Sequence, residues 1–189
     1  SAPEYTRRKL LELAKEKLGN SLVETFFYRN KEIIKNKFQR TGFPKTGSET
    51  TLIGGELKDK AIIRHIEPKA FIAWQKLYED HALWKNEGFD YVPIEPIYSY
   101  HLNKGGLVDV YSGVLDLNLS AWKLMGGEFS QELDNDANKI RKIIEKLAVL
   151  HGHDHDNNFC LRFFRDQDGK VDFSQKPRIY LIDFDQAKS

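Results

Sequence analysis

Apolar residues recur at helical spacing in three stretches of the chain. Leu10, Ala14 and Leu18 stand four residues apart, and this spacing predicts a helix over 4–18 that packs on the body of the protein. A longer pattern that opens at Pro68 predicts a helix over 68–86. A third pattern predicts a helix over 134–150, and a short helix is expected near 120–125.

Shorter stretches rich in β-branched and aromatic residues alternate with these helices and predict strands. Asn103-Lys104-Gly105-Gly106 is typical of a turn and joins two of the strands as a hairpin, and the polar loop 165–170 joins the last two. The predicted strands are 36–40, 50–53, 61–66, 98–102, 107–115, 159–163 and 179–182. Hairpins mixed with single helices predict an α+β fold with antiparallel sheets.

Composition and charge exclude several classes of protein. The chain has 189 residues, 40% hydrophobic and 30% charged, which is typical of one globular domain, alone or with an appendage. Its net charge of +1 lacks the basic excess of a general nucleic-acid binder. No apolar run is long enough to span a membrane, and no secretion signal is visible at the N-terminus. The single cysteine, Cys160, fits a reducing compartment, so we expect a cytoplasmic protein.

Two polar loops flank the last predicted hairpin and carry the candidate chemistry. The first runs from His151 to Asn158, and the second comprises Asp183, Phe184 and Asp185. Because a hairpin brings the ends of its strands together, we expect these loops to meet. Amide and carboxylate oxygens suit Mg²⁺, so Asn158 and Asp183 are the candidate metal ligands.

The order of these elements resembles the protein-kinase-like fold. In that fold a helix precedes H-x-D-x-x-x-x-N, and a strand hairpin leads from this loop to D-F-G. Here His151-Gly152-His153 is followed by Asn158 at the same spacing, and Ile182-Asp183-Phe184-Asp185 stands at the second position. The tail is similar to that of lipopolysaccharide-core and Rio-like kinases. The resemblance implies a helix at 1–20, a first lobe at 21–115 with an antiparallel sheet, and a reduced helical second lobe at 116–189.

The resemblance also implies a phosphotransferase that uses ATP and Mg²⁺. The γ-phosphoryl group would pass to a hydroxyl of a sugar, a lipid-linked sugar or a protein. Arg64 stands where the kinase strand V-A-I-K has its phosphate-binding lysine, and Glu79 on the next helix is its candidate partner. A turn with Gly42, Lys45 and Gly47 is placed like the loop that covers the phosphates.

Three departures from the kinase pattern leave other interpretations open. His153 replaces the aspartate that accepts the substrate proton, although Asp154 and Asp156 are close by. An arginine replaces the lysine, and guanidinium and ammonium are not equivalent. Only six residues follow Asp183, where ordinary kinases continue with an activation segment and further helices, so the resemblance implies a minimal kinase or a shortened chain.

A pseudokinase that binds nucleotide, or acts only through partners, is the first alternative. A zinc-dependent hydrolase is the second, because His151, His153 and His155 are similar to the H-x-H-x-D-H loop of the metallo-β-lactamase fold. In this chain the last two residues of that motif are reversed, and no histidine follows His155.

Overall fold

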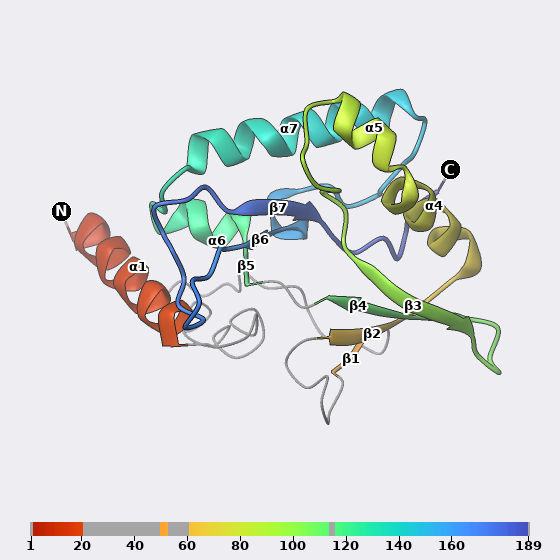
Figure 1. Cartoon of the computed structure of the whole chain (residues 1–189), viewed down its shortest axis with the longest axis horizontal. Coiled ribbons are helices and arrows are strands. Elements are labelled where there is room, and N and C mark those ends of the chain that lie inside the picture. The colour runs from red at the N-terminus through yellow and green to blue at the C-terminus, as the bar shows by residue number, and fades with distance from the viewer. Residues whose placement is uncertain (1, 21–49, 53–60, 114–115, 189) are drawn as a thin grey trace.

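A computed structural model of the protein describes residues 2–20, 50–52, 61–113 and 116–188. These residues form a mixed α+β fold with two antiparallel sheets and several helices (Figure 1). The expected strand at 36–40 and the expected phosphate loop with Gly42, Lys45 and Gly47 lie outside the described residues.

The first sheet has four strands in the order β1-β2-β4-β3. These strands are β1 (Thr50–Leu52), β2 (Ala61–Ile66), β3 (Ile97–Leu102) and β4 (Val108–Gly113). All three pairings are antiparallel, and Arg64 of β2 lies opposite Val110 of β4. The predicted hairpin of β3 and β4 is therefore confirmed.

The predicted helix 68–86 is two helices, α4 (Pro68–Glu79) and α5 (His81–Asn86). Asp80 interrupts the helix with a ψ of 69°, and its carboxylate accepts a hydrogen bond from Leu83 N at 3.2 Å. An aspartate at this position caps a new helix better than it continues an old one. The prediction of one continuous helix was wrong for this local reason.

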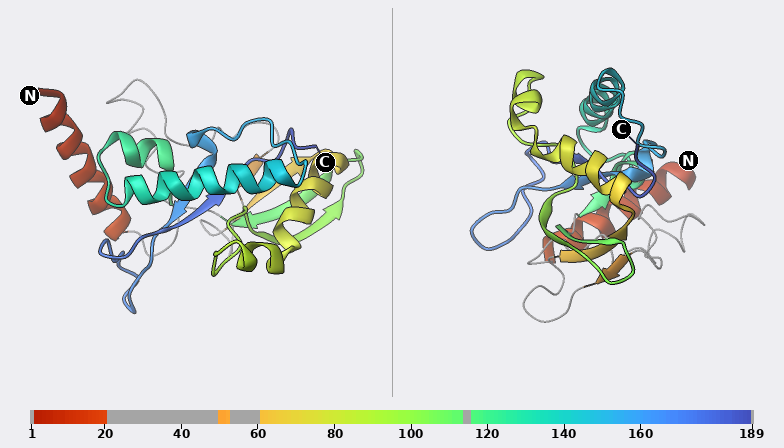
Figure 2. Two further views of the ribbon diagram at one scale, coloured as in Figure 1. Left: turned by 90° about the horizontal axis from the view of Figure 1, so that it is seen from above. Right: turned by 90° about the vertical axis from the view of Figure 1, so that its right-hand side faces the viewer.

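The second sheet has three strands in the order β5-β6-β7. They are β5 (Leu117–Asn118), β6 (Phe159–Arg162) and β7 (Arg178–Leu181), and β5 was not predicted. The helices α6 (Leu119–Leu124) and α7 (Ser130–Lys146) precede β6 along the chain, as does the short 3₁₀ helix η2 (Asp156–Asn158). Figure 2 shows α7 running the length of this part of the molecule.

The segment 93–95 connects the two sheets. Glu95 N donates to Leu181 O at 2.8 Å, and Leu181 N donates to Pro93 O at 2.9 Å. The chain therefore leaves the α4–α5 pair, runs beside β7 and then enters β3. This path places Glu95 between the two sheets.

Helix α1 (Ala2–Asn20) packs on the body through the predicted stripe of Leu10, Ala14 and Leu18, which are all buried. Arg165 Nη1 donates to Leu18 O at 3.3 Å, and Lys15 forms an ion pair with Glu128. No helix in the described part of the chain is long and apolar enough to cross a membrane.

A column of rings connects α4 to the two polar loops. The Trp74 and Phe184 rings stack at 6.0 Å with an interplanar angle of 3°, and the His151 ring meets Phe184 edge-on at 4.7 Å. Trp74, Phe184 and His151 are all buried. Tight packing of this kind gives the two loops one defined position relative to α4.

Candidate functional site

Hydrogen bonds join the two polar loops at the end of the β6–β7 hairpin. Phe159 lies opposite Leu181 in the ladder, so the residues just before β6 and just after β7 are neighbours. Ile182 N donates to Asn158 O at 2.8 Å, and His151 Nε2 donates to Ile182 O at 2.8 Å. The prediction that a hairpin brings the loops together is confirmed.

His151 is a structural residue of the first loop, as the resemblance implied. Its ring is buried, and its Nδ1 accepts a hydrogen bond from His153 N at 3.0 Å while Nε2 donates across the site. Burial lowers the pKa of His151. The neutral imidazole therefore links the two loops through one donor and one acceptor.

Asn158 is buried at the end of η2 and faces the same loop. Its Nδ2 donates to His153 O at 2.8 Å. That bond determines which side of the amide carries the oxygen, the atom that a hard cation would use.

Asp183 is held in an unusual backbone conformation. Its φ of 64° lies in the left-handed region, which costs a non-glycine residue on the order of 1 kcal/mol or more. Asp183 N donates to Glu95 Oε1 at 3.0 Å, so the carboxylate of Glu95 holds this turn. Strain that the surroundings maintain is typical of functional positions.

Asp185 lies close enough to Asp183 for an electrostatic interaction between the two carboxylates. Burial and the Asp183 carboxylate raise the pKa of Asp185 to about 6, while His153 and Arg64 act in the opposite direction. Two neighbouring carboxylates that repel each other are stabilised by a cation. Sequence reasoning did not assign Asp185 to the site, although it follows Asp183 by two residues.

Arg64 has a different partner from the one that we predicted. Its Nε donates to Glu95 Oε2 at 2.5 Å, and its Nη1 lies 3.9 Å from Asp183 Oδ1. Glu79 is exposed and accepts a hydrogen bond from Gln75 Nε2 at 3.1 Å. Because α4 ends at Glu79 and presents that side chain to solvent, the assignment of Glu79 to Arg64 was wrong.

Glu95 is the functional residue that the sequence analysis missed. It is 1% exposed, and its Oε2 also accepts from Ser112 Oγ at 2.5 Å. Pro93 and Pro96 flank it, so this stretch had the pattern of a linker or an edge strand. An acidic residue beside the apolar Ile94 was the one signal that it faces inward.

The three predicted proton acceptors have different surroundings. Asp156 accepts from Lys123 Nζ and from Arg141 Nη2, both at 2.9 Å, and these two cations lower its pKa. A carboxylate with a lowered pKa is a weak base, so these two bonds suit Asp156 to anchoring the loop, and its assignment to proton transfer stays a prediction. Asp154 is exposed, and its backbone oxygen accepts from Arg141 Nε at 2.7 Å. His153 is half-buried, and its electrostatic interaction with Asp185 lowers the pKa of that carboxylate.

Magnesium fits this donor set better than zinc does. In the part of the chain that the structure describes, no three histidine, cysteine or acidic side chains converge as a metal site. Both ring nitrogens of His151 are engaged in hydrogen bonds, which leaves none for zinc. Magnesium needs one or two carboxylates and completes its shell with water and phosphate oxygens. Asp183, Asp185 and Asn158 are the side chains of the two loops that carry oxygen donors of this kind.

Comparison with known proteins adds no family to this picture. No protein-family model matches the chain, and no curated protein is significantly similar to it in sequence.

Proposed function

We propose that the protein is a Mg²⁺-dependent phosphotransferase that moves the γ-phosphoryl group of ATP to a hydroxyl. The observation that carries this proposal is the pair of hydrogen-bonded loops, in which Asn158 adjoins Ile182 and therefore Asp183. Transfer of a nucleotide phosphate with Mg²⁺ needs oxygen donors for the metal and a fixed positive side chain for the phosphates. Arg64 supplies that positive side chain.

The arrangement of elements supports a two-lobed kinase-like fold. The first sheet carries Arg64 on β2, and α4 follows β2 directly and precedes the β3–β4 hairpin. Helix α7 then leads to the His151 loop, and the β6–β7 hairpin leads to Asp183. This is the order in which a kinase places its phosphate-binding strand, next helix, catalytic loop and metal-binding aspartate.

In this proposal each side chain has a distinct task. Arg64, positioned by Glu95, binds the phosphates of ATP. Asn158, Asp183 and Asp185 hold Mg²⁺, which when bound neutralises charge on the phosphates. These groups orient the nucleotide, and the protein itself forms no covalent bond to the transferred phosphate.

The proton of the acceptor hydroxyl passes to His153. The acceptor oxygen forms its bond to the γ-phosphorus as the bond between that phosphorus and the bridging oxygen of ADP breaks. A neutral imidazole offers a ring nitrogen that can accept this proton. The acceptor is a sugar, a lipid-linked sugar or a protein hydroxyl.

The test measures nucleotide binding and phosphate transfer separately. Isothermal titration with a non-hydrolysable ATP analogue is carried out with and without Mg²⁺, and transfer is followed with radiolabelled ATP. Asp183→Ala is expected to abolish the Mg²⁺-dependent part of both, while Asp168→Ala, which removes an exposed carboxylate in the β6–β7 loop, leaves them unchanged. Absence of nucleotide binding in the wild-type protein would overturn the proposal.

A pseudokinase is the second candidate, and the histidine at the base position favours it. Mg²⁺-dependent binding without transfer to any hydroxyl acceptor identifies this case. His153→Asp then restores the residue that kinases have at this position. If that variant transfers phosphate, the inactivity of the wild-type protein is due to His153.

A further inference from the structure

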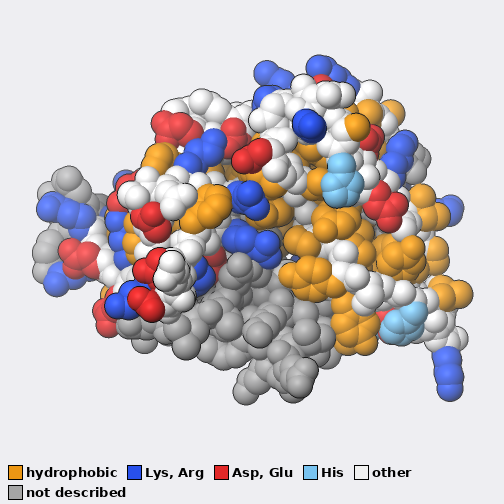
Figure 3. All heavy atoms as spheres, viewed as in Figure 1, with side chains coloured by type: hydrophobic (Ala, Val, Ile, Leu, Met, Phe, Trp, Pro, Cys, Tyr) orange, Lys and Arg blue, Asp and Glu red, His pale blue; other side chains and the backbone are white. Residues whose placement is uncertain are grey.

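Strand β3 is the last strand of the first sheet among the described strands, and it exposes an unusual amount of apolar surface. Every residue from Tyr98 to Leu102 is exposed. In the described part of the chain five large hydrophobic side chains are exposed, and three of them lie on this strand: Tyr98 at 57%, Tyr100 at 49% and Leu102 at 68%. Figure 3 shows hydrophobic side chains gathered on this side of the molecule.

A fourth exposed side chain extends the same surface onto α4. The Phe71 and Tyr100 rings lie 4.6 Å apart, and Gln75 Nε2 donates to Tyr100 Oη at 2.9 Å. Ile72, which is 58% exposed, precedes Gln75 by three residues, so these two side chains are neighbours on the surface of α4. Apolar surface that converges on one strand edge is typical of an interaction site.

The backbone of β3 can accept a further strand. Asn103 N donates to Leu107 O at 2.8 Å, which establishes which pairs of the β3–β4 ladder are hydrogen-bonded. Hydrogen-bonded and non-hydrogen-bonded pairs alternate along an antiparallel ladder. Counting from Asn103, the residues Leu102 and Tyr100 belong to non-hydrogen-bonded pairs, so their N–H and C=O groups point away from β4. The strand Ile97–Leu102 contains no proline and no lysine, the residues that usually block such an edge.

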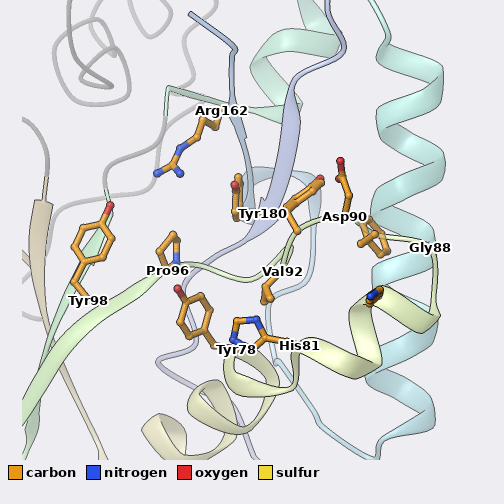
Figure 4. Close-up of a pocket in the computed structure, with 12 residues that line it drawn as sticks. Tyr78, His81, Gly88, Asp90, Val92, Pro96, Tyr98, Arg162 and Tyr180 are labelled. Atoms are coloured by element: carbon orange, nitrogen blue, oxygen red, sulfur yellow. The ribbon is translucent and has the colours of Figure 1, made fainter.

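A pocket of about 800 Å³ opens at the Ile97 end of this edge. Figure 4 shows Tyr78, Tyr98 and Tyr180 around it, with Pro96 between them. These residues come from α4, β3 and β7, so the pocket lies where the two sheets meet. Its aromatic walls suit a large apolar side chain, and its volume leaves room for the groups next to that side chain.

The charges that line the pocket favour an anion. His81, Lys85 and Arg162 line it, and Asp90 is the acidic residue among its lining residues. Arg162 also lies over the Tyr180 ring, 5.4 Å from its centre. Lys85 is exposed at the rim, where it can attract an approaching carboxylate.

We propose that an extended acidic segment of a partner protein docks here by adding a strand to β3, with an aromatic side chain in the pocket and a carboxylate beside Lys85. A second copy of this chain fits less well. Antiparallel pairing of two β3 strands would bring Lys104 of one copy to the pocket of the other, and this places like charges together. The occupant is therefore an acidic peptide, recognised through its backbone and through one pocket.

The test uses a labelled peptide of about ten residues, which is enough to form one strand. It alternates valine with threonine and carries phenylalanine and glutamate at both ends, so that either strand direction can fill the pocket. A second peptide has lysine in place of every glutamate. Fluorescence anisotropy is expected to show binding of the acidic peptide and much weaker binding of the basic one. Hydrogen exchange at the amides of Tyr100 and Leu102 should slow when the acidic peptide binds.

Two substitutions separate the parts of the surface. Lys85→Glu reverses the charge at the rim and is expected to weaken binding roughly tenfold. Leu102→Pro removes one outward N–H and is expected to weaken binding by about threefold to tenfold, whereas Leu102→Thr retains the N–H and much of the affinity. The melting temperature of each variant is recorded, so that loss of folding is recognised.

Three outcomes would overturn the proposal. The first is an acidic peptide that does not bind, and the second is a basic peptide that binds equally well. The third is self-association of the wild-type protein that Leu102→Pro abolishes, because the edge would then be an interface between copies of the chain.

Discussion

Arg64 Nε donates a hydrogen bond to Glu95 Oε2 at 2.5 Å between the two sheets of the protein. The other carboxylate oxygen of Glu95 accepts from Asp183 N at 3.0 Å. One buried side chain therefore positions both the cation of the proposed phosphate site and the backbone of the turn that we propose binds the metal. Glu95 thus couples the first sheet to the second.

Glu95→Gln is expected to lower the free energy of unfolding by about 3 kcal/mol, because it leaves the buried guanidinium of Arg64 without its carboxylate. Urea denaturation followed by tryptophan fluorescence measures this change. The same substitution should weaken nucleotide binding, since Arg64 loses the group that orients it.

Glu79→Gln is the matched control for that experiment. It makes the same chemical change on an exposed side chain at the end of α4, so stability and binding should stay near the wild-type values. Equal effects of the two substitutions would contradict the assignment of Glu95 as the partner of Arg64.

The pKa of Asp185 provides a second prediction. Burial and Asp183 raise this pKa to about 6, so the folded protein holds a proton that the unfolded chain releases near 3.8. The resulting contribution to stability is fully present below pH 3.8 and is lost as the pH rises through about 6. Asp183→Asn removes one cause of the shift and should lower the pKa, as carboxyl ¹³C chemical shifts can show. An unchanged pKa would mean that burial alone raises it.

Much of the site could be predicted from short-range patterns. The spacing of His151, Asn158 and Asp183 around a hairpin was enough to predict that the loops meet, because strand pairing brings the two ends of a hairpin together. The structure also confirms that the apolar stripe of α1 is buried and that β3 and β4 form a hairpin. In each case the decisive contacts lie within one element or between neighbours in the chain.

The errors arose where tertiary contacts decide. Glu79 and Glu95 are both acidic residues near α4, and only the path of the chain between the sheets shows which of them reaches Arg64. The two ion pairs of Asp156 were likewise not predicted, because Lys123 and Arg141 reach it from α6 and α7. No local pattern in the sequence contains that information.

His151 provides a third prediction, with the opposite dependence on pH. Burial lowers its pKa below the ordinary 6.5, so the unfolded chain binds a proton that the folded protein excludes. Its contribution to stability is present above pH 6.5 and is lost as the pH falls. His151→Gln should lower stability at neutral pH and flatten the loss of stability below it, as urea titrations at several pH values would show. His155→Gln, on an exposed ring of the same loop, is the control.

Asp116 and Arg165 form a buried ion pair where β5 begins and β6 ends, with Arg165 Nη2 donating to Asp116 Oδ1 at 2.9 Å. The other carboxylate oxygen accepts from Phe163 N at 2.9 Å. Asp116→Ala leaves a buried guanidinium and a buried N–H without this acceptor, so it should lower the free energy of unfolding by about 3 to 5 kcal/mol. Asp168→Ala, on an exposed carboxylate, should leave the urea midpoint almost unchanged. Equal midpoints for the wild type and Asp116→Ala would show that water solvates Arg165 in the variant, and the pair would then contribute little to stability.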